Sequence, residues 1–115
     1  MKLIFLLIFL IFTADGLYSN DLQNARELYY KSAQESDYID SAIEAFEKLA
    51  KSEPAKECLS KVYIGSLTAM RAVPAFWPQD KLEWANKGIE KMDKAVKNCS
   101  DCVEALFIQG TTLHY

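Results

Sequence analysis

Cysteine is the residue type in this chain that could do the most chemistry, and three occur in 115 residues: Cys58, Cys99 and Cys102. Cys99 and Cys102 enclose two residues, a CxxC spacing that supports thiol–disulfide exchange when a helix N-terminus lowers a thiol pKa. That motif normally belongs to a βαβ unit, but no strand-like alternation surrounds it here, and Asp101 disfavours a thiolate at Cys102. We therefore expect one structural disulfide and one remaining thiol. A redox protein using Cys99 and Cys102 is the alternative.

Other reactive sites have little support in the sequence. Cys58, Cys99, Cys102 and His114 contain the atoms of a Cys3His zinc set, but His114 lies about 18 Å beyond Cys102 if one helix joins them. There is no glycine-rich phosphate loop and no convincing Ser/His/Asp set. A net charge of −3 argues against a basic nucleic-acid surface. We expect no catalysis, no metal, no cofactor and no nucleic-acid partner.

The first sixteen residues have the pattern of a signal peptide. Lys2 precedes an unbroken apolar run over residues 3–12, and Ala14 and Gly16 supply the small residues of a cleavage site. Ten helical residues rise about 15 Å, half of a bilayer core of about 30 Å, so a stable membrane anchor is the weaker interpretation. The sequence predicts cleavage after Gly16 and export to the periplasm or the extracellular space, which leaves residues 17–115 as one domain.

Apolar residues recur every three or four positions in five segments of that domain, a pattern typical of amphipathic helices. The first helix begins at residues 19–21, Ser36 and Asp37 cap the second, and Pro54 either ends the second or opens the third. The fourth runs from near Asp80 to near Lys97, and the fifth begins near Asp101. The sequence thus predicts an all-α fold of antiparallel hairpins. Among the side chains expected on the buried faces are Ala33, Val73, Leu82 and Val103.

The hairpin topology also places the cysteines. Cys58 starts a first helix, Cys99 ends a second helix, and Cys102 starts the next first helix. First helices begin, and second helices end, at the same edge of a stack of hairpins. All three thiols should therefore cluster at one edge, and which two of them pair stays open.

An internal repeat accompanies the helices. Ala42 and Phe46 recur as Gly88 and Met92, 46 residues later, and Gly65 recurs as Gly110, 45 residues later. A helix–turn–helix unit of about 34 residues, lengthened here by an insertion over residues 74–81, resembles the tetratricopeptide repeat (TPR). Pro54 after Phe46 also fits that pattern, whereas no tryptophan opens a first helix. The resemblance covers roughly residues 22–114, and the chain also looks like small exported helical proteins of no assigned activity.

The resemblance implies a binding scaffold, a short α-solenoid whose first helices line a groove for a protein or peptide. Carried onto this chain, the residues that would face the groove are Asn24, Glu27, Lys31, Ser66, Phe107 and Thr111. We expect an exported scaffold that mediates protein or peptide binding. An envelope-assembly or solute-handling accessory protein is a further alternative.

Two apolar features fall outside this scheme. Phe76 and Trp77 lie between Pro74 and Pro78, and we expect them to plug the hairpin end against Trp84 or Tyr63 rather than to form a partner-binding knob. The fifth helix carries more apolar residues, Leu106, Phe107, Ile108 and Leu113, than a terminal solenoid helix needs. Either the chain is truncated or a second copy covers this helix, as in a homo-oligomer.

Overall fold

The computed structural model describes residues 21–99 and 102–114. In these residues it contains five α-helices, two short 3-10 helices and no strand, which confirms the all-α prediction. The predicted signal peptide over residues 1–16 and its cleavage site lie outside the described residues. No helix within the described ranges is both long enough and apolar enough to cross a bilayer.

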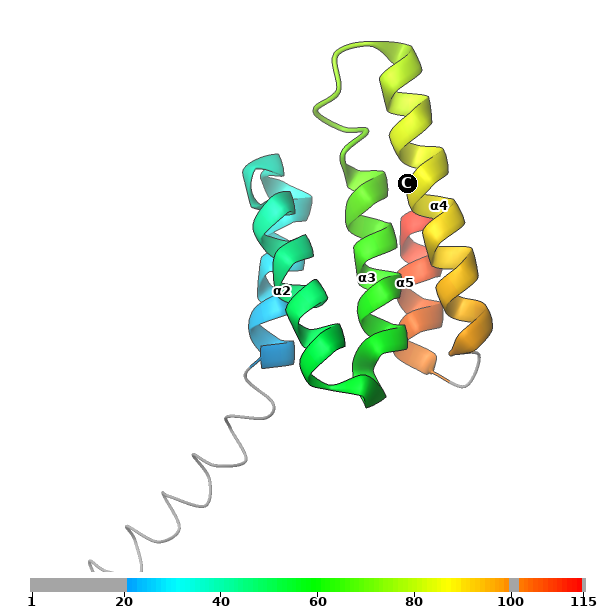
Figure 1. Cartoon of the computed structure of the whole chain (residues 1–115). Coiled ribbons are helices and arrows are strands. Elements are labelled where there is room, and N and C mark those ends of the chain that lie inside the picture. The colour runs from blue at the N-terminus through cyan, green and yellow to red at the C-terminus, as the bar shows by residue number, and fades with distance from the viewer. Residues whose placement is uncertain (1–20, 100–101, 115) are drawn as a thin grey trace, which may run out of the picture.

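The helices follow one another as hairpins (Figure 1). A helix over residues 21–34 is followed by η1 (Ser36–Tyr38), α2 (Ile39–Ser52), η2 (Pro54–Lys56), α3 (Glu57–Met70), α4 (Pro78–Asn98) and α5 (Val103–His114). Pro54 and Pro78 stand at helix N-termini, where a missing N–H costs nothing. The expected cap at Ser36 and Asp37 is wrong, because α2 starts from the 3-10 turn η1 and no side chain caps it.

The central helix is α3, which packs against α2, α4 and α5. The ring of Tyr63 lies in the middle of the core, stacked on Phe46 with 4.4 Å between ring centroids and touched edge-on by Tyr29 at 4.9 Å. The remaining buried apolar side chains are Leu22, Ala25, Ile39, Ala42, Leu49, Val62, Leu67, Met92, Ala95, Ala105 and Ile108. Every one of the five helices contributes to this core.

Two glycines let α3 and α4 touch at the backbone. A Cβ atom added at Gly88 would lie 2.5 Å from the carbonyl oxygen of Gly65 and 2.4 Å from the backbone nitrogen of Ala69. A Cβ at Gly65 would lie 2.8 Å from the backbone nitrogen of Met92. Since real side chains do not approach so closely, glycine is required at both positions for this packing.

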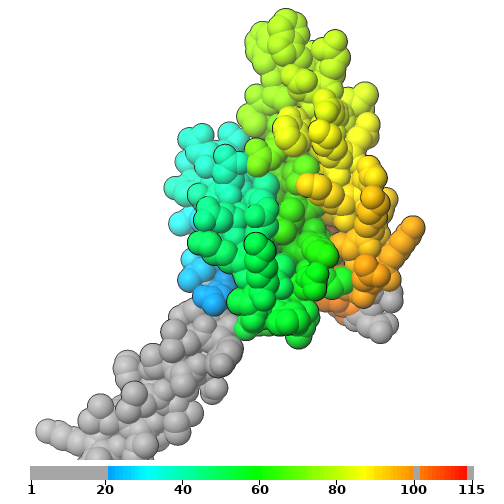
Figure 2. All heavy atoms as spheres, viewed as in Figure 1, coloured from blue at the N-terminus to red at the C-terminus, as the bar shows by residue number. Residues whose placement is uncertain are grey.

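Several side chains that the periodicity assigns to buried faces are exposed instead, among them Ala33, Val73, Leu82, Val103 and Leu113. Val73 and Leu82 flank the turn between α3 and α4, which stands clear of the other helices (Figure 2). Val103 lies on the side of α5 that faces away from the core. A helical period predicts a stripe along a helix, but it does not predict how far the neighbouring helices extend to cover it.

Candidate functional site

The turn between α3 and α4 is fixed by local chemistry. Pro78 starts α4, and the residue before it, Trp77, is extended (φ −89°, ψ 137°), as a residue before proline prefers. Lys81, in the first turn of α4, reaches back to the α3 side of the turn. Its ammonium group donates to the backbone carbonyls of Ala72 (3.1 Å) and Val73 (3.0 Å), which have no helical partner there. The turn is therefore held in one shape without packing its own aromatic rings.

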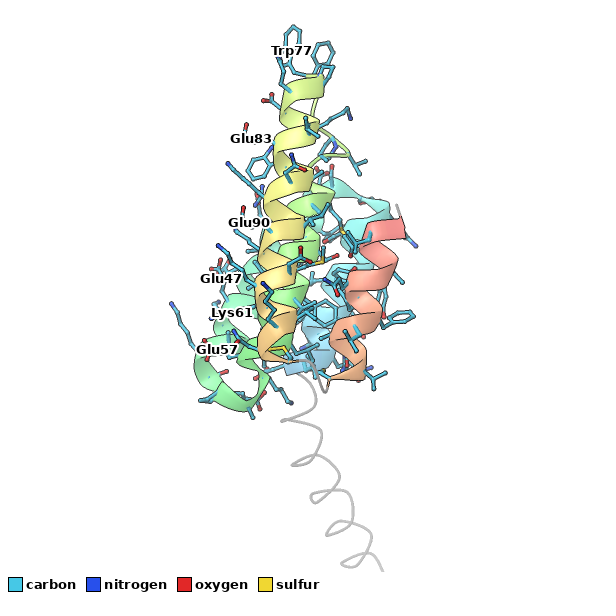
Figure 3. All side chains as sticks on the ribbon, turned by 90° about the vertical axis from the view of Figure 1, so that its right-hand side faces the viewer. Glu47, Glu57, Lys61, Trp77, Glu83 and Glu90 are labelled. Atoms are coloured by element: carbon cyan, nitrogen blue, oxygen red, sulfur yellow. A yellow bond between two sulfur atoms is a disulfide. The ribbon has the colours of Figure 1, made fainter. Side chains whose placement is uncertain are left out.

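Those rings point into solvent. Phe76 is 83% exposed and Trp77 is 59% exposed, and they contact each other edge to face at 5.1 Å. Figure 3 shows Trp77 at the extreme end of the molecule. Val73 in the same turn and Leu82 near the start of α4 are also exposed, and we call these four residues the aromatic tip (Val73, Phe76, Trp77, Leu82).

The expectation that Phe76 and Trp77 plug the hairpin against Trp84 or Tyr63 is wrong. Tyr63 is enclosed between Phe46 and Tyr29, and the ring of Trp84 is covered by Arg71 and Lys87, whose charged groups lie 5.3 Å and 5.2 Å from its centroid. The α3–α4 turn lies beyond the ends of the neighbouring helices, and its exposed rings are therefore not packed against the core that holds Tyr63.

A shallow polar notch adjoins the tip. Arg71 is its central group: it forms an ion pair with Asp40 at 2.6 Å and lies over Trp84. The complete lining is Ser36, Ile39, Asp40, Arg71, Pro74, Ala75, Asp80 and Trp84. An apolar projection beside oriented charged groups can anchor a protein partner and also fix its orientation.

The six residues assigned to a groove do not form one. Ser66 is fully buried: its hydroxyl is hydrogen-bonded to Tyr29 Oη at 2.8 Å and to Thr112 Oγ1 at 2.7 Å, which corrects its assignment as a partner-binding residue. The helix over residues 21–34 and α5 meet across α3 at this point and close the expected groove.

The other five groove candidates are dispersed. Asn24 lines a shallow pocket against α2, and Lys31 lies over the ring of Tyr38 at 5.6 Å. Glu27 is exposed on the same helix. Phe107 is exposed on α5, and Thr111 donates its hydroxyl to the carbonyl of Phe107 within that helix.

Sequence reasoning missed a polar bridge that joins three helices. Glu104 of α5 accepts hydrogen bonds from Arg26 Nε (2.9 Å), Arg26 Nη2 and the Tyr63 hydroxyl. Burial acts to raise the pKa of Glu104, but the hydrogen bonds from Arg26 and Tyr63 outweigh it and hold this pKa below its ordinary value. Burial and the bond to Glu104 raise the pKa of Tyr63. No local pattern signals a contact between residues 78 positions apart.

We expect Glu104→Gln to lower the free energy of unfolding by about 2 kcal/mol, because Arg26 loses its carboxylate partner in a partly buried site. The folded-state pKa of Glu104 is depressed, so its stabilisation is present above the ordinary value of 4.5 and is lost as the pH falls through the lower folded value. The wild type should therefore lose more stability on acidification than the variant, measured by urea unfolding at several pH values.

Glu90→Gln is the matched control for this prediction. Glu90 forms an exposed ion pair with Lys94 one helical turn away, at 3.2 Å. Such pairs contribute at most about 0.5 kcal/mol. Equal losses for the two variants would show that the bridge to Arg26 adds nothing.

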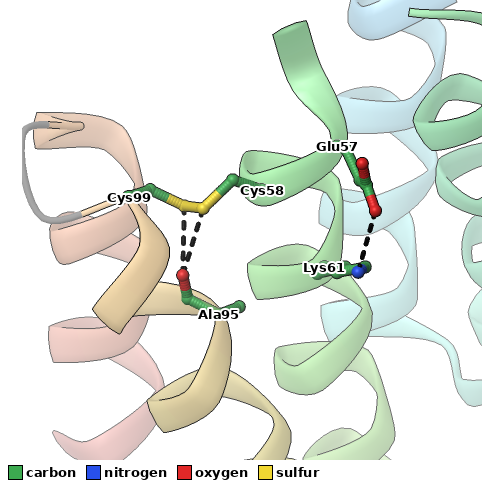
Figure 4. The surroundings of a disulfide bond; sticks show 5 residues. All are labelled: Glu57, Cys58, Lys61, Ala95 and Cys99. Atoms are coloured by element: carbon green, nitrogen blue, oxygen red, sulfur yellow. Dashed lines mark hydrogen bonds and ion pairs between the residues drawn. A yellow bond between two sulfur atoms is a disulfide. The ribbon is translucent and has the colours of Figure 1, made fainter. Parts of the chain in front are cut away.

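A disulfide ties the opposite end of the α3–α4 hairpin (Figure 4). It joins Cys58, in the first turn of α3, to Cys99, directly after α4, with the Cα atoms 5.9 Å apart. Cys102 keeps a free, partly buried thiol. This pairing answers the question, left open by the sequence, of which two cysteines pair.

Within residues 21–99 and 102–114, no three Cys, His, Asp or Glu side chains are arranged to hold a metal ion. No family model matches the chain. Comparison with curated proteins and with solved structures likewise finds no match.

Proposed function

We propose that this chain is an exported helical scaffold that binds a protein partner through its aromatic tip. The observation that carries this proposal is the exposure of Phe76 and Trp77 on a turn that Pro78 and the Lys81 hydrogen bonds hold in place. Aromatic side chains are enriched among the residues that dominate interface energies. A turn that is already ordered loses little conformational entropy on binding.

The scaffold character rests on the packed hairpins. Their side-by-side arrangement and the glycine contact between α3 and α4 support a TPR-like repeat, with binding moved from the first-helix groove to the end of the hairpin. The signal-peptide pattern supports export to the periplasm or the extracellular space. The Cys58–Cys99 bond also favours this location, because disulfides persist in oxidising compartments.

The test is a capture experiment with the mature chain, residues 17–115, immobilised and exposed to an envelope or secreted-protein extract of the producing organism. We expect a partner that the wild type retains and that the double variant Phe76→Ala/Trp77→Ala loses by more than about tenfold. Because both side chains already face solvent, the thermal unfolding midpoint should not change. Tyr30→Ala, at an exposed ring on the helix over residues 21–34, is the control and should retain the partner.

A second readout separates protein from membrane binding. The chain has two tryptophans, so a Trp84→Phe variant reports only on Trp77. Its emission should shift to the blue when the captured partner is added and should not shift with phospholipid vesicles. A shift with vesicles alone, or the absence of any partner that depends on the tip, would overturn the proposal.

A further inference from the structure

A second apolar surface lies on α5, away from the tip. Val103, Phe107 and Gly110 are spaced three or four residues apart, and so are Leu106, Gly110 and Leu113, which places all five on one face of the helix. Val103 is 80% exposed and Phe107 is 61% exposed, while Ala105 and Ile108 on the opposite face are buried in the core. We call these five residues the α5 stripe.

Gly110 in this stripe has open space around it. A Cβ atom added there would meet no atom within 4 Å, whereas the corresponding glycine of the preceding unit, Gly65, lies directly against the backbone of α4. Glycine at an exposed helical position is less stable than alanine, and nothing in the described part of the chain compensates for it. A glycine at position 110 would be favourable if a second helix packed against α5 as closely as α4 packs against α3.

The lack of charge on the α5 stripe indicates which helix would pack against it. The only charged residue of α5 is Glu104, which is occupied by Arg26 and Tyr63. The outer face of α4, in contrast, carries alternating charges such as Glu83, Lys87 and Glu90 (Figure 3). An uncharged face can meet an identical face across a two-fold axis without placing like charges together.

The stripe is also complementary to itself. Gly110 has bulky side chains on both sides along the helix, Leu106 and Phe107 before it and Leu113 after it. If two copies of α5 cross in antiparallel orientation at Gly110, the Leu106 and Phe107 side chains of one copy lie beside Leu113 of the other. The apolar surface available is on the order of 1,000 Å² for the pair, at the lower limit of specific interfaces.

We propose that the α5 stripe is a homodimer interface, in which two copies of this chain pack α5 against α5 about a two-fold axis at Gly110. This inference is independent of the proposed function of the tip. The α3–α4 hairpin lies alongside α5, so an antiparallel pair directs the two aromatic tips to opposite ends of the dimer.

The test is sedimentation velocity of the mature, oxidised chain from micromolar to near-millimolar concentration. We expect a reversible monomer–dimer equilibrium that Phe107→Glu and Gly110→Leu each weaken by at least about 30-fold in Kd. Gly110→Leu replaces an unpacked helical glycine with a better helix former, so the monomer should unfold no more easily than the wild type. Phe76→Glu, at the tip, is the control and should leave the dimer unchanged.

The orientation is tested by cross-linking. In a Cys102→Ser background, Gly110→Cys should form an intermolecular disulfide on oxidation, because Gly110 lies at the axis. A chain that stays monomeric throughout the concentration range would overturn the proposal. So would a dimer that tolerates both stripe variants, or a mass that grows beyond two copies, which would indicate an open assembly.

Discussion

Replacement of both Cys58 and Cys99 by serine is expected to lower the free energy of unfolding by about 4 kcal/mol. The bond closes a loop with a sequence separation of 41 residues, and it removes much of the freedom of that segment in the unfolded chain. A domain of this size is stable by only about 5–15 kcal/mol, so the loss is a large fraction of the total. Urea unfolding followed by helical circular dichroism measures it.

The remaining thiol supplies the control for this prediction. Cys102→Ser leaves the Cys58–Cys99 bond intact and should change stability by less than about 1 kcal/mol. Wild-type protein treated with a reductant should unfold at the same urea concentration as the double variant. A Cys102→Ser variant as unstable as the double variant would show that the native bond involves Cys102 instead.

The helices and their order could be predicted because they depend on local signals. Apolar residues every three or four positions identify the five segments, and the alternation of first and second helices places Cys58 and Cys99 at one edge. The pairing itself could not be predicted. Three cysteines at the same edge satisfy the topology equally well, and only side-chain positions distinguish them.

The candidate site could be predicted only in part. The sequence identifies Phe76 and Trp77 as an unusual aromatic pair, but their exposure depends on how far α4 extends beyond its neighbours. Ser66 illustrates the opposite error: a small polar residue on a first helix is consistent with a groove surface until Tyr29 and Thr112, 37 and 46 positions away, are found to enclose it. Contacts between distant residues leave no periodic signal in one sequence.

The contact between Gly65 and Gly88 predicts a second large loss of stability. We expect Gly88→Ala to lower the free energy of unfolding by about 3 kcal/mol. Alanine is intrinsically better than glycine in a helix by about 1 kcal/mol, but its methyl group would lie 2.5 Å from the Gly65 carbonyl oxygen, and backbone atoms cannot turn aside as a side chain can. The helices α3 and α4 must therefore separate, and the core around Met92 must loosen with them.

Gly110→Ala is the matched control, because the same substitution in α5 meets nothing within 4 Å. At concentrations low enough to keep the chain monomeric, it should raise stability by about 1 kcal/mol, opposite in sign to Gly88→Ala. The double variant Gly65→Ala/Gly88→Ala should lose less than the two single losses combined, because helices that one methyl group has already separated accommodate the second more easily. Fully additive losses would mean that the two glycines do not share one contact, and a neutral Gly88→Ala would mean that α3 and α4 do not meet at their backbones.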